Sequence, residues 1–238
     1  MKRYVIAPMK QPMGGLATLA IAHDGGLWVG ATAGLAYFDP RSETARAALY
    51  ENGDAVESQI SSIVHDSRGV LWVATQTGLA MRPAGASRFR KFTREQNTGG
   101  TLSSNAIIGL HVDRRDRVWV GTATGLDRLI AFDGQRATFE AIAPRIGRDG
   151  ERGENLVEDA SGRIWIDGET MFDPDTLQWR DFAPSEGAGR VIWRGAAARL
   201  RSGQLMFGGP DGLLVADPVA TKPWILRAAR RDQRGARR

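Results

Sequence analysis

The chain has 238 residues, of which 42% are apolar and 25% charged, and it contains no cysteine. This composition is that of an ordinary globular protein, and the lack of cysteine excludes disulfides, thiol catalysis and cysteine-based zinc sites. The net charge of +5 comes from the tail, because residues 227–238 hold six Arg and one Asp.

The N-terminal residues 1–14 begin with a basic dipeptide, and their apolar stretch at 4–7 is far too short for a signal peptide. No run of 18 or more apolar residues occurs anywhere, so the sequence predicts no membrane-spanning segment. As written, the chain is therefore expected in the cytoplasm.

The first structural unit follows, and its hydrophobic pattern is that of short strands. The segment ATLAIAHD (17–24) alternates with period two, which predicts a half-buried strand. An Asp-Gly turn leads into LWVG (27–30), and a Thr/Gly turn leads into GLAYFDP (34–40). ARAALY (45–50) is a fourth, more polar strand. No helical periodicity interrupts these strands.

This unit is repeated along the chain. The phrase GLWVGATAGL at 26–35 returns as VLWVATQTGL and RVWVGTATGL. The anchoring Trp residues are spaced by 44, 47 and 46 residues, and Met206 takes the Trp position 41 residues later. The five units are 15–57, 58–103, 104–150, 151–190 and a degenerate 191–226.

Four short strands repeating every 41 to 47 residues are typical of the blades of a β-propeller. We therefore predict an all-β protein of about five four-stranded blades, either a closed ring or part of a larger, truncated propeller. Residues 1–14 are a candidate outer strand of a closing blade, 224–229 a candidate last strand, and 227–238 a basic disordered tail.

The repeated Trp positions are interpreted as structural. An indole removes roughly 150–250 Å² from water when buried, so it can fill the gap between two blades. The residues concerned are Trp28, Trp72, Trp119 and Trp165.

The repeat resembles the two-component regulator propeller family, whose pattern is D-x-x-G-x-L-W-V-G-T-x-x-G-L. The second unit carries Asp66, Gly69, Leu71, Trp72, Val73, Thr75, Gly78 and Leu79. The third carries Asp113, Val118, Trp119, Val120, Gly121, Thr122, Gly125 and Leu126. The resemblance implies the extracytoplasmic sensor region of bacterial hybrid histidine kinases, a periplasmic location, and glycan or other nutrient ligands. The signalling output would be supplied by domains absent from this sequence.

Candidate catalytic residues are few. His23 and His65 both stand directly before a turn Asp, which indicates a structural role, and His111 has no partners for a zinc site. The turn residues Asp24, Asp66, Asp113 and Asp159 recur because each closes the same turn. The sequence therefore predicts no enzyme, no metal and no cofactor. The alternatives are a propeller lyase or hydrolase acting on a carbohydrate-like substrate, and a truncated remnant of a sensor gene.

Ligand binding is expected on the loops at one end of the propeller, where polar side chains gather. The candidates are Gln59, Thr75, Asn105, Thr122 and Asn155. Their hydrogen-bonding groups suit a glycan or a peptide. If the ring is open, a protein partner or self-association is expected. The tail lacks aromatic residues for base stacking, so nucleic acid is not expected as a partner.

Overall fold

The computed structural model describes residues 15–95, 99–133, 135–148, 150, 152–182, 196–209 and 212–220. These residues form five antiparallel sheets. The first contains β1 (Leu16–Ile21), β2 (Leu27–Ala31), β3 (Leu35–Asp39) and β4 (Thr44–Ala47). The second contains β5 (Ile60–His65), β6 (Leu71–Thr75), β7 (Gly78–Arg82) and β8 (Arg90–Phe92).

The third sheet contains β9 (Ile107–Val112), β10 (Val118–Thr122), β11 (Gly125–Phe132) and β12 (Ala137–Ala141). The fourth contains β13 (Leu156–Glu158), β14 (Ile164–Ile166), β15 (Thr170–Phe172) and β16 (Trp179–Asp181). The fifth contains β17 (Ala197–Arg199), β18 (Leu205–Gly209) and β19 (Gly212–Ala216). A single 3₁₀ turn, Ala143–Ile146, lies among the described residues.

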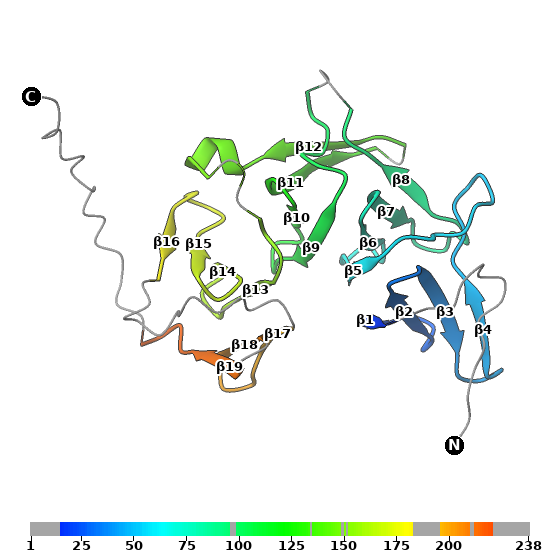
Figure 1. Ribbon diagram of the computed structural model, residues 1–238, viewed down its shortest axis with the longest axis horizontal. Helices are drawn as coiled ribbons and strands as arrows, with labels where there is room; N and C mark the ends of the chain where they lie inside the picture. The colour runs from blue at the N-terminus through cyan, green and yellow to red at the C-terminus, as the bar shows by residue number, and fades with distance from the viewer. Residues whose placement is uncertain are drawn as a thin grey trace, which may run out of the picture.

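The predicted all-β propeller is confirmed. Each sheet is an up-and-down meander, and the first strands of successive sheets lie side by side around a common centre (Figure 1). Within the described residues the fifth sheet has three strands rather than four. The predicted strand at 224–229 and the segments 1–14 and 227–238 lie outside those residues.

The blades are held together by apolar junctions. We call the face of a blade that carries its Trp the front face and the opposite face the back face. Trp28 of the front of blade 1 packs with Ile63, Leu71 and Val73 from the back of blade 2. The same arrangement returns around Trp72, Trp119 and Trp165. All four indoles are buried, so each one fills the space between two blades.

A buried carboxylate stabilises the turn between the first two strands of blades 2, 3 and 4. In blade 3, Asp113 Oδ1 accepts the backbone N–H groups of Arg115 and Arg117, at 2.9 and 3.0 Å. Its Oδ2 accepts Arg117 Nε at 2.5 Å and Trp119 Nε1 at 2.9 Å. The turn Asp therefore joins the turn, an Arg and the interblade Trp in one network, which goes beyond the turn closure expected from sequence.

Blade 1 departs from this arrangement. Asp24 is exposed and accepts only the Gly26 N–H in its turn, together with the Tyr37 hydroxyl. The turn hydrogen bonds that Asp66 makes through its backbone are made in blade 1 by Ala22. Trp28 Nε1 consequently has no hydrogen-bond partner among the described residues. The expectation that Asp24 is equivalent to the other turn acids is wrong.

The histidines are offset in the same way as the acids: just as Asp24 lies two residues after the counterpart of Asp66, His23 lies two residues after the counterpart of His65. His65 pairs with Leu71, as Ile21 pairs with Leu27, so Ile21 and not His23 is the counterpart of His65. The rings of His23 and His65 nevertheless meet edge to face, with centroids 4.8 Å apart. Burial, and then the charge of His23, lower the pKa of His65. The pair is a contact between blades 1 and 2.

Candidate functional site

The central cavity is lined by the first strand of every blade. Its volume is about 590 Å³. Because the walls are the innermost strands of five packed sheets, the positions of their side chains are fixed by the fold. The strands contribute Thr18, Ser61, Ser62, Val64, Ile108, Leu110, His111, Leu156 and Ala197, and the segments that precede them add Gln59, Glu154, Asn155 and Ala196.

The lining is mostly neutral and polar. Hydroxyl groups come from Thr18, Ser61 and Ser62, and amide groups from Gln59 and Asn155. Ser61 Oγ donates to the carbonyl oxygen of Ile107 at 3.0 Å and so ties blade 2 to blade 3. Such groups can donate and accept hydrogen bonds without a charge, which suits an uncharged ligand rich in hydroxyl or amide groups.

The five predicted ligand-binding residues are separated by the structure into two groups. Gln59 and Asn155 line the central cavity together. Asn155 is also held by Asp167, which accepts both its backbone N–H and its side-chain amide. Thr75 and Thr122 are fully buried, and their hydroxyls donate to the carbonyl oxygens of Gly78 and Gly125 in their own turns.

Asn105 lies apart from the cavity. It is exposed, and its side-chain oxygen accepts the backbone N–H of Arg94 at 2.6 Å. Thr75, Thr122 and Asn105 therefore stabilise loops, whereas Gln59 and Asn155 face a space that a ligand can enter.

A second cavity, of about 270 Å³, lies between blades 3 and 4. Its floor is apolar, from Ile146, Phe172 and Trp179, and Arg148 lies over the Trp179 ring at 5.5 Å. Glu169 stands at the rim, and burial, followed by the charges of Asp167 and Asp181, raises its pKa. Arg148 and Arg152 also line this cavity, so its charged groups are of both signs.

The segment 152–155 separates these two cavities. Arg152 and Gly153 face the smaller one, and Glu154 and Asn155 face the central one. The segment lies directly on blade 3, because a Cβ at Gly109 or Gly121 would overlap the carbonyl oxygens of Glu154 and Gly153. Glycine is required at these two positions by the close approach of backbone rather than by a turn.

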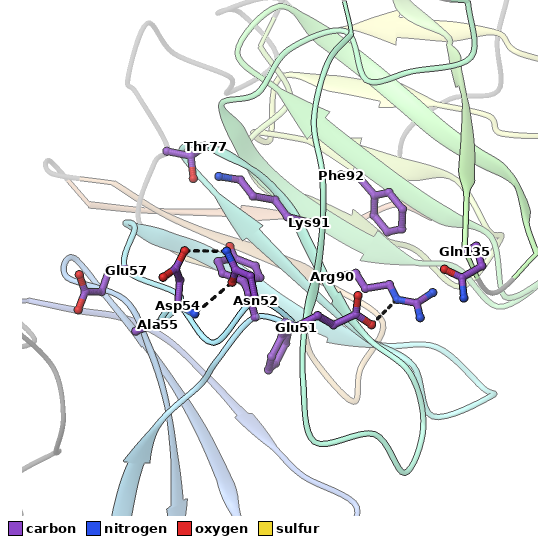
Figure 2. A pocket seen from close by; sticks show the side chains of 12 residues that line it. Glu51, Asn52, Asp54, Ala55, Glu57, Thr77, Arg90, Lys91, Phe92 and Gln135 are labelled. Carbon is purple, nitrogen blue, oxygen red and sulfur yellow. Dashed lines mark hydrogen bonds and ion pairs between the residues drawn. The ribbon is translucent and has the colours of Figure 1, made fainter.

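A third hollow, of about 630 Å³, runs along the outer edge of blade 2 (Figure 2). One wall is β8, and the other is the loop after β4, which carries Glu51, Asn52 and Asp54 (Figure 2). Glu51 accepts from Arg90 Nε at 2.6 Å. Asn52 Nδ2 donates to Asp54 at 2.7 Å. The polar groups of this hollow are largely paired with one another, so it offers fewer groups to a ligand than the central cavity does.

His111 lines the central cavity, and Glu158 lies beside it. His111 Nε2 is 3.6 Å from Glu158 Oε2, and Glu158 also accepts the backbone N–H of Arg114 at 3.0 Å. Burial lowers the pKa of His111, against the charge of Glu158. The lowered pKa favours the neutral imidazole, which has a ring nitrogen that can accept a proton. Within the described residues no cluster of three or more His, Cys, Asp or Glu could hold a metal ion.

Asp127, in β11 of blade 3, is a buried acid that was not identified from the sequence. It replaces Ala36 and Ala80 of the corresponding strands, and an acid at a position that is alanine in blades 1 and 2 was the available signal. Its Oδ2 accepts the Ser103 N–H at 2.8 Å, and its buried Oδ1 has no partner among the described residues. Burial raises the pKa of Asp127 to about 6.

Asp127→Asn is expected to stabilise the protein at high pH. The pKa of Asp127 is about 6 in the folded protein and about 3.9 in the unfolded chain, so ionisation of this carboxyl opposes folding. The loss of stability is absent below about pH 4 and complete above the folded pKa. Asn keeps the acceptor for Ser103 and carries no charge. Urea unfolding should show a gain of about 2–3 kcal/mol at pH 8 and about half of that at pH 5.

Asp133→Asn is the control for this experiment, because Asp133 is exposed and hydrogen bonds from Arg136 and Gln135 lower its pKa. It should bring no gain at either pH. A gain for Asp127→Asn that did not change with pH would contradict the raised pKa.

The comparisons with known proteins agree with this geometry. The sequence profile of the two-component regulator propeller matches residues 56–77 and 101–124, which contain the Asp–Arg–Trp turns of blades 2 and 3. The chain carries two-component regulator propeller repeats. No curated protein matches the chain.

Solved structures share the propeller fold at low identity. The extracellular domain of a hybrid two-component system from B. thetaiotaomicron is 17% identical, with a TM-score of 0.66 over 87% of this chain and 28% of that one. PorZ, a surface component of the type-IX secretion system of Porphyromonas gingivalis, is 15% identical, with a TM-score of 0.66 over 90% of this chain and 34% of that one. Virginiamycin B lyase from Staphylococcus aureus is 13% identical, with a TM-score of 0.59 over 90% of this chain and 73% of that one.

This chain thus spans about a third of the length of the first two structures. At these identities the likeness shows the fold alone. Among the described residues there is no helix with the length and apolar character that a membrane crossing requires.

Proposed function

We propose that the chain is a non-enzymatic ligand-binding module of the sensor type. Its ligand is uncharged and rich in hydroxyl groups, a glycan rather than a peptide, and binds in the central cavity. The observation that carries this proposal is the group of hydroxyls and amides that Thr18, Gln59, Ser62 and Asn155 bring to the cavity lining, where Glu154 is the one acidic residue among those described. The family of the repeat and the sensor domain with the same fold support it. Signalling output would come from other domains or partners.

The sensor domain from B. thetaiotaomicron is described as extracellular. We therefore propose that this module also works outside the cytoplasm. The cytoplasmic location expected from the sequence as written has no support among these structures.

Binding is tested by screening neutral oligosaccharides and short uncharged peptides for an increase in melting temperature, and by titrating any hit calorimetrically. Gln59→Ala should weaken binding about tenfold, as the loss of about 1.4 kcal/mol of hydrogen bonding does. Gln59 is exposed, so its loss should leave the melting temperature of the free protein unchanged.

Gln76→Ala is the matched control. Gln76 is also exposed, its N–H donates to the Gln59 carbonyl, and its side chain does not line the central cavity. Binding should be the same as in the unmodified protein. If no probe bound, or if both variants bound equally well, the proposed site would be wrong.

A second function is favoured by the His111–Glu158 pair. A neutral imidazole beside a carboxylate, facing a cavity, is an arrangement suited to a general base in a lyase or hydrolase. The Arg114 clamp on Glu158 supports the structural interpretation instead. Mass spectrometry of the incubated probes decides between them: a product that forms with the unmodified chain and not with His111→Ala would establish an enzyme.

A further inference from the structure

The two ends of the arc of blades expose apolar side chains. On the back face of blade 1, Leu19 is 56% exposed and Ile21 76% exposed. On the front face of blade 5, Leu213 is 54% exposed and Val215 48% exposed. These two sheets are the first and last along the chain, and in Figure 1 they form the two ends of the arc.

The same positions are buried wherever two blades meet. Leu19 pairs with Val29 as Ile63 pairs with Val73, and Ile63 is only 8% exposed because blade 1 covers it. At the other end, Val215 pairs with Met206 as Met81 pairs with Trp72. Met81 is fully buried against blade 3.

Each end is therefore one half of a blade junction. The back face of blade 1 has the chemistry that accepts a front face, and the front face of blade 5 has the chemistry that accepts a back face. Neither β1 nor β19 carries a charged residue to prevent such a contact.

We propose that a second copy of this chain docks head to tail, with the front face of blade 5 of one copy on the back face of blade 1 of the next. The internal junctions supply the template, since four of them already join a front face to a back face within the chain. Both end faces are exposed in the same molecule, so among the described residues neither end covers the other.

This contact joins two different surfaces, so it is heterologous. Each added copy presents a fresh end, so the contact gives a ring where the rotation between copies closes and an open filament where it does not. The proposal concerns assembly and is independent of the ligand proposed for the central cavity.

The first test is the mass of the full chain by light scattering over a range of concentrations. The unmodified chain should show a mass of two or more copies that decreases on dilution. Ile21→Glu and Val215→Glu, one on each face, should each raise the dissociation constant about tenfold or more, because a charge would be buried at the contact.

Ile130→Glu is the matched control, since Ile130 is 53% exposed and lies in β11 away from both end faces. It should associate as the unmodified chain does. A monomer at every concentration would overturn the proposal, and so would an equal loss of association in all three variants.

The second test uses the lack of cysteine. Leu19→Cys chains mixed with Val215→Cys chains should form a dimer with a short bismaleimide linker, and neither should do so alone. An isologous contact would instead link Leu19→Cys to itself. In the double variant, cross-linking within a monomer would show that one chain closes its own ring, which would also overturn the proposal.

Discussion

Replacing Asp113 with alanine is expected to lower the free energy of unfolding by about 3–5 kcal/mol. The side chain is fully buried and accepts hydrogen bonds from two backbone N–H groups, from Arg117 and from Trp119. Alanine would leave the buried indole N–H unpartnered and the guanidinium without its buried counter-charge.

The control for this substitution is Asp24→Ala. Asp24 also precedes a Trp, but it is exposed and accepts one backbone N–H from its own turn together with the Tyr37 hydroxyl. Its loss should cost no more than a turn cap, about 1 kcal/mol or less. Urea denaturation of both variants measures the difference, and equal costs would contradict the distinction between blade 1 and blade 3.

The stability that Asp113 contributes should depend on pH. Burial would raise the pKa of Asp113, but the hydrogen bonds from Trp119 and Arg117 and the Arg117 charge outweigh it, so the pKa is lowered. The carboxylate therefore stabilises the fold above the unfolded pKa of about 3.9, and this stability is lost as the pH falls through the folded pKa. Asp113→Ala should reduce the loss of stability on acidification.

The repeat made the fold predictable from sequence. The Trp spacing gave the number of blades, and period-two alternation placed the strands, because both reflect local packing that every blade shares. The misassignment of Asp24 had a signal that was overlooked. Asp24 precedes Trp28 by four residues, whereas Asp66 precedes Trp72 by six. The two turns have the same length, but Asp24 stands two positions later in its turn than Asp66 does, and Ala22 takes the position of the buried acid.

The candidate site was predictable only in part. Polarity of a loop residue does not say whether its side chain faces a cavity or its own turn, and Thr75 and Gln59 illustrate the two outcomes. Which residues of an innermost strand face the centre depends on how five sheets pack. The hydroxyls of Thr18 and Ser62 were therefore not identified, although both stand in strands that are otherwise rich in apolar residues.

Trp119→Ala is expected to cost about 3–5 kcal/mol of unfolding free energy, as other truncations of core aromatics do. The indole is fully buried among Leu156, Ile164 and Phe172 of the next blade, with the Phe172 ring 5.4 Å away. Its removal would open a cavity at the junction and leave Asp113 without its indole donor.

Met206 occupies the Trp position of blade 5 and provides the comparison. It is half-buried on a front face with no blade against it, so Met206→Ala should cost about 1 kcal/mol or less in a dilute solution of single chains. The cost of Met206→Ala is measured by urea unfolding at two protein concentrations, one too low for the chains to associate and one high enough for them to do so. If the cost at Met206 is small when dilute and rises with concentration, a second copy supplies the missing neighbour. A large cost at every concentration would mean that the front face of blade 5 is already covered within one chain.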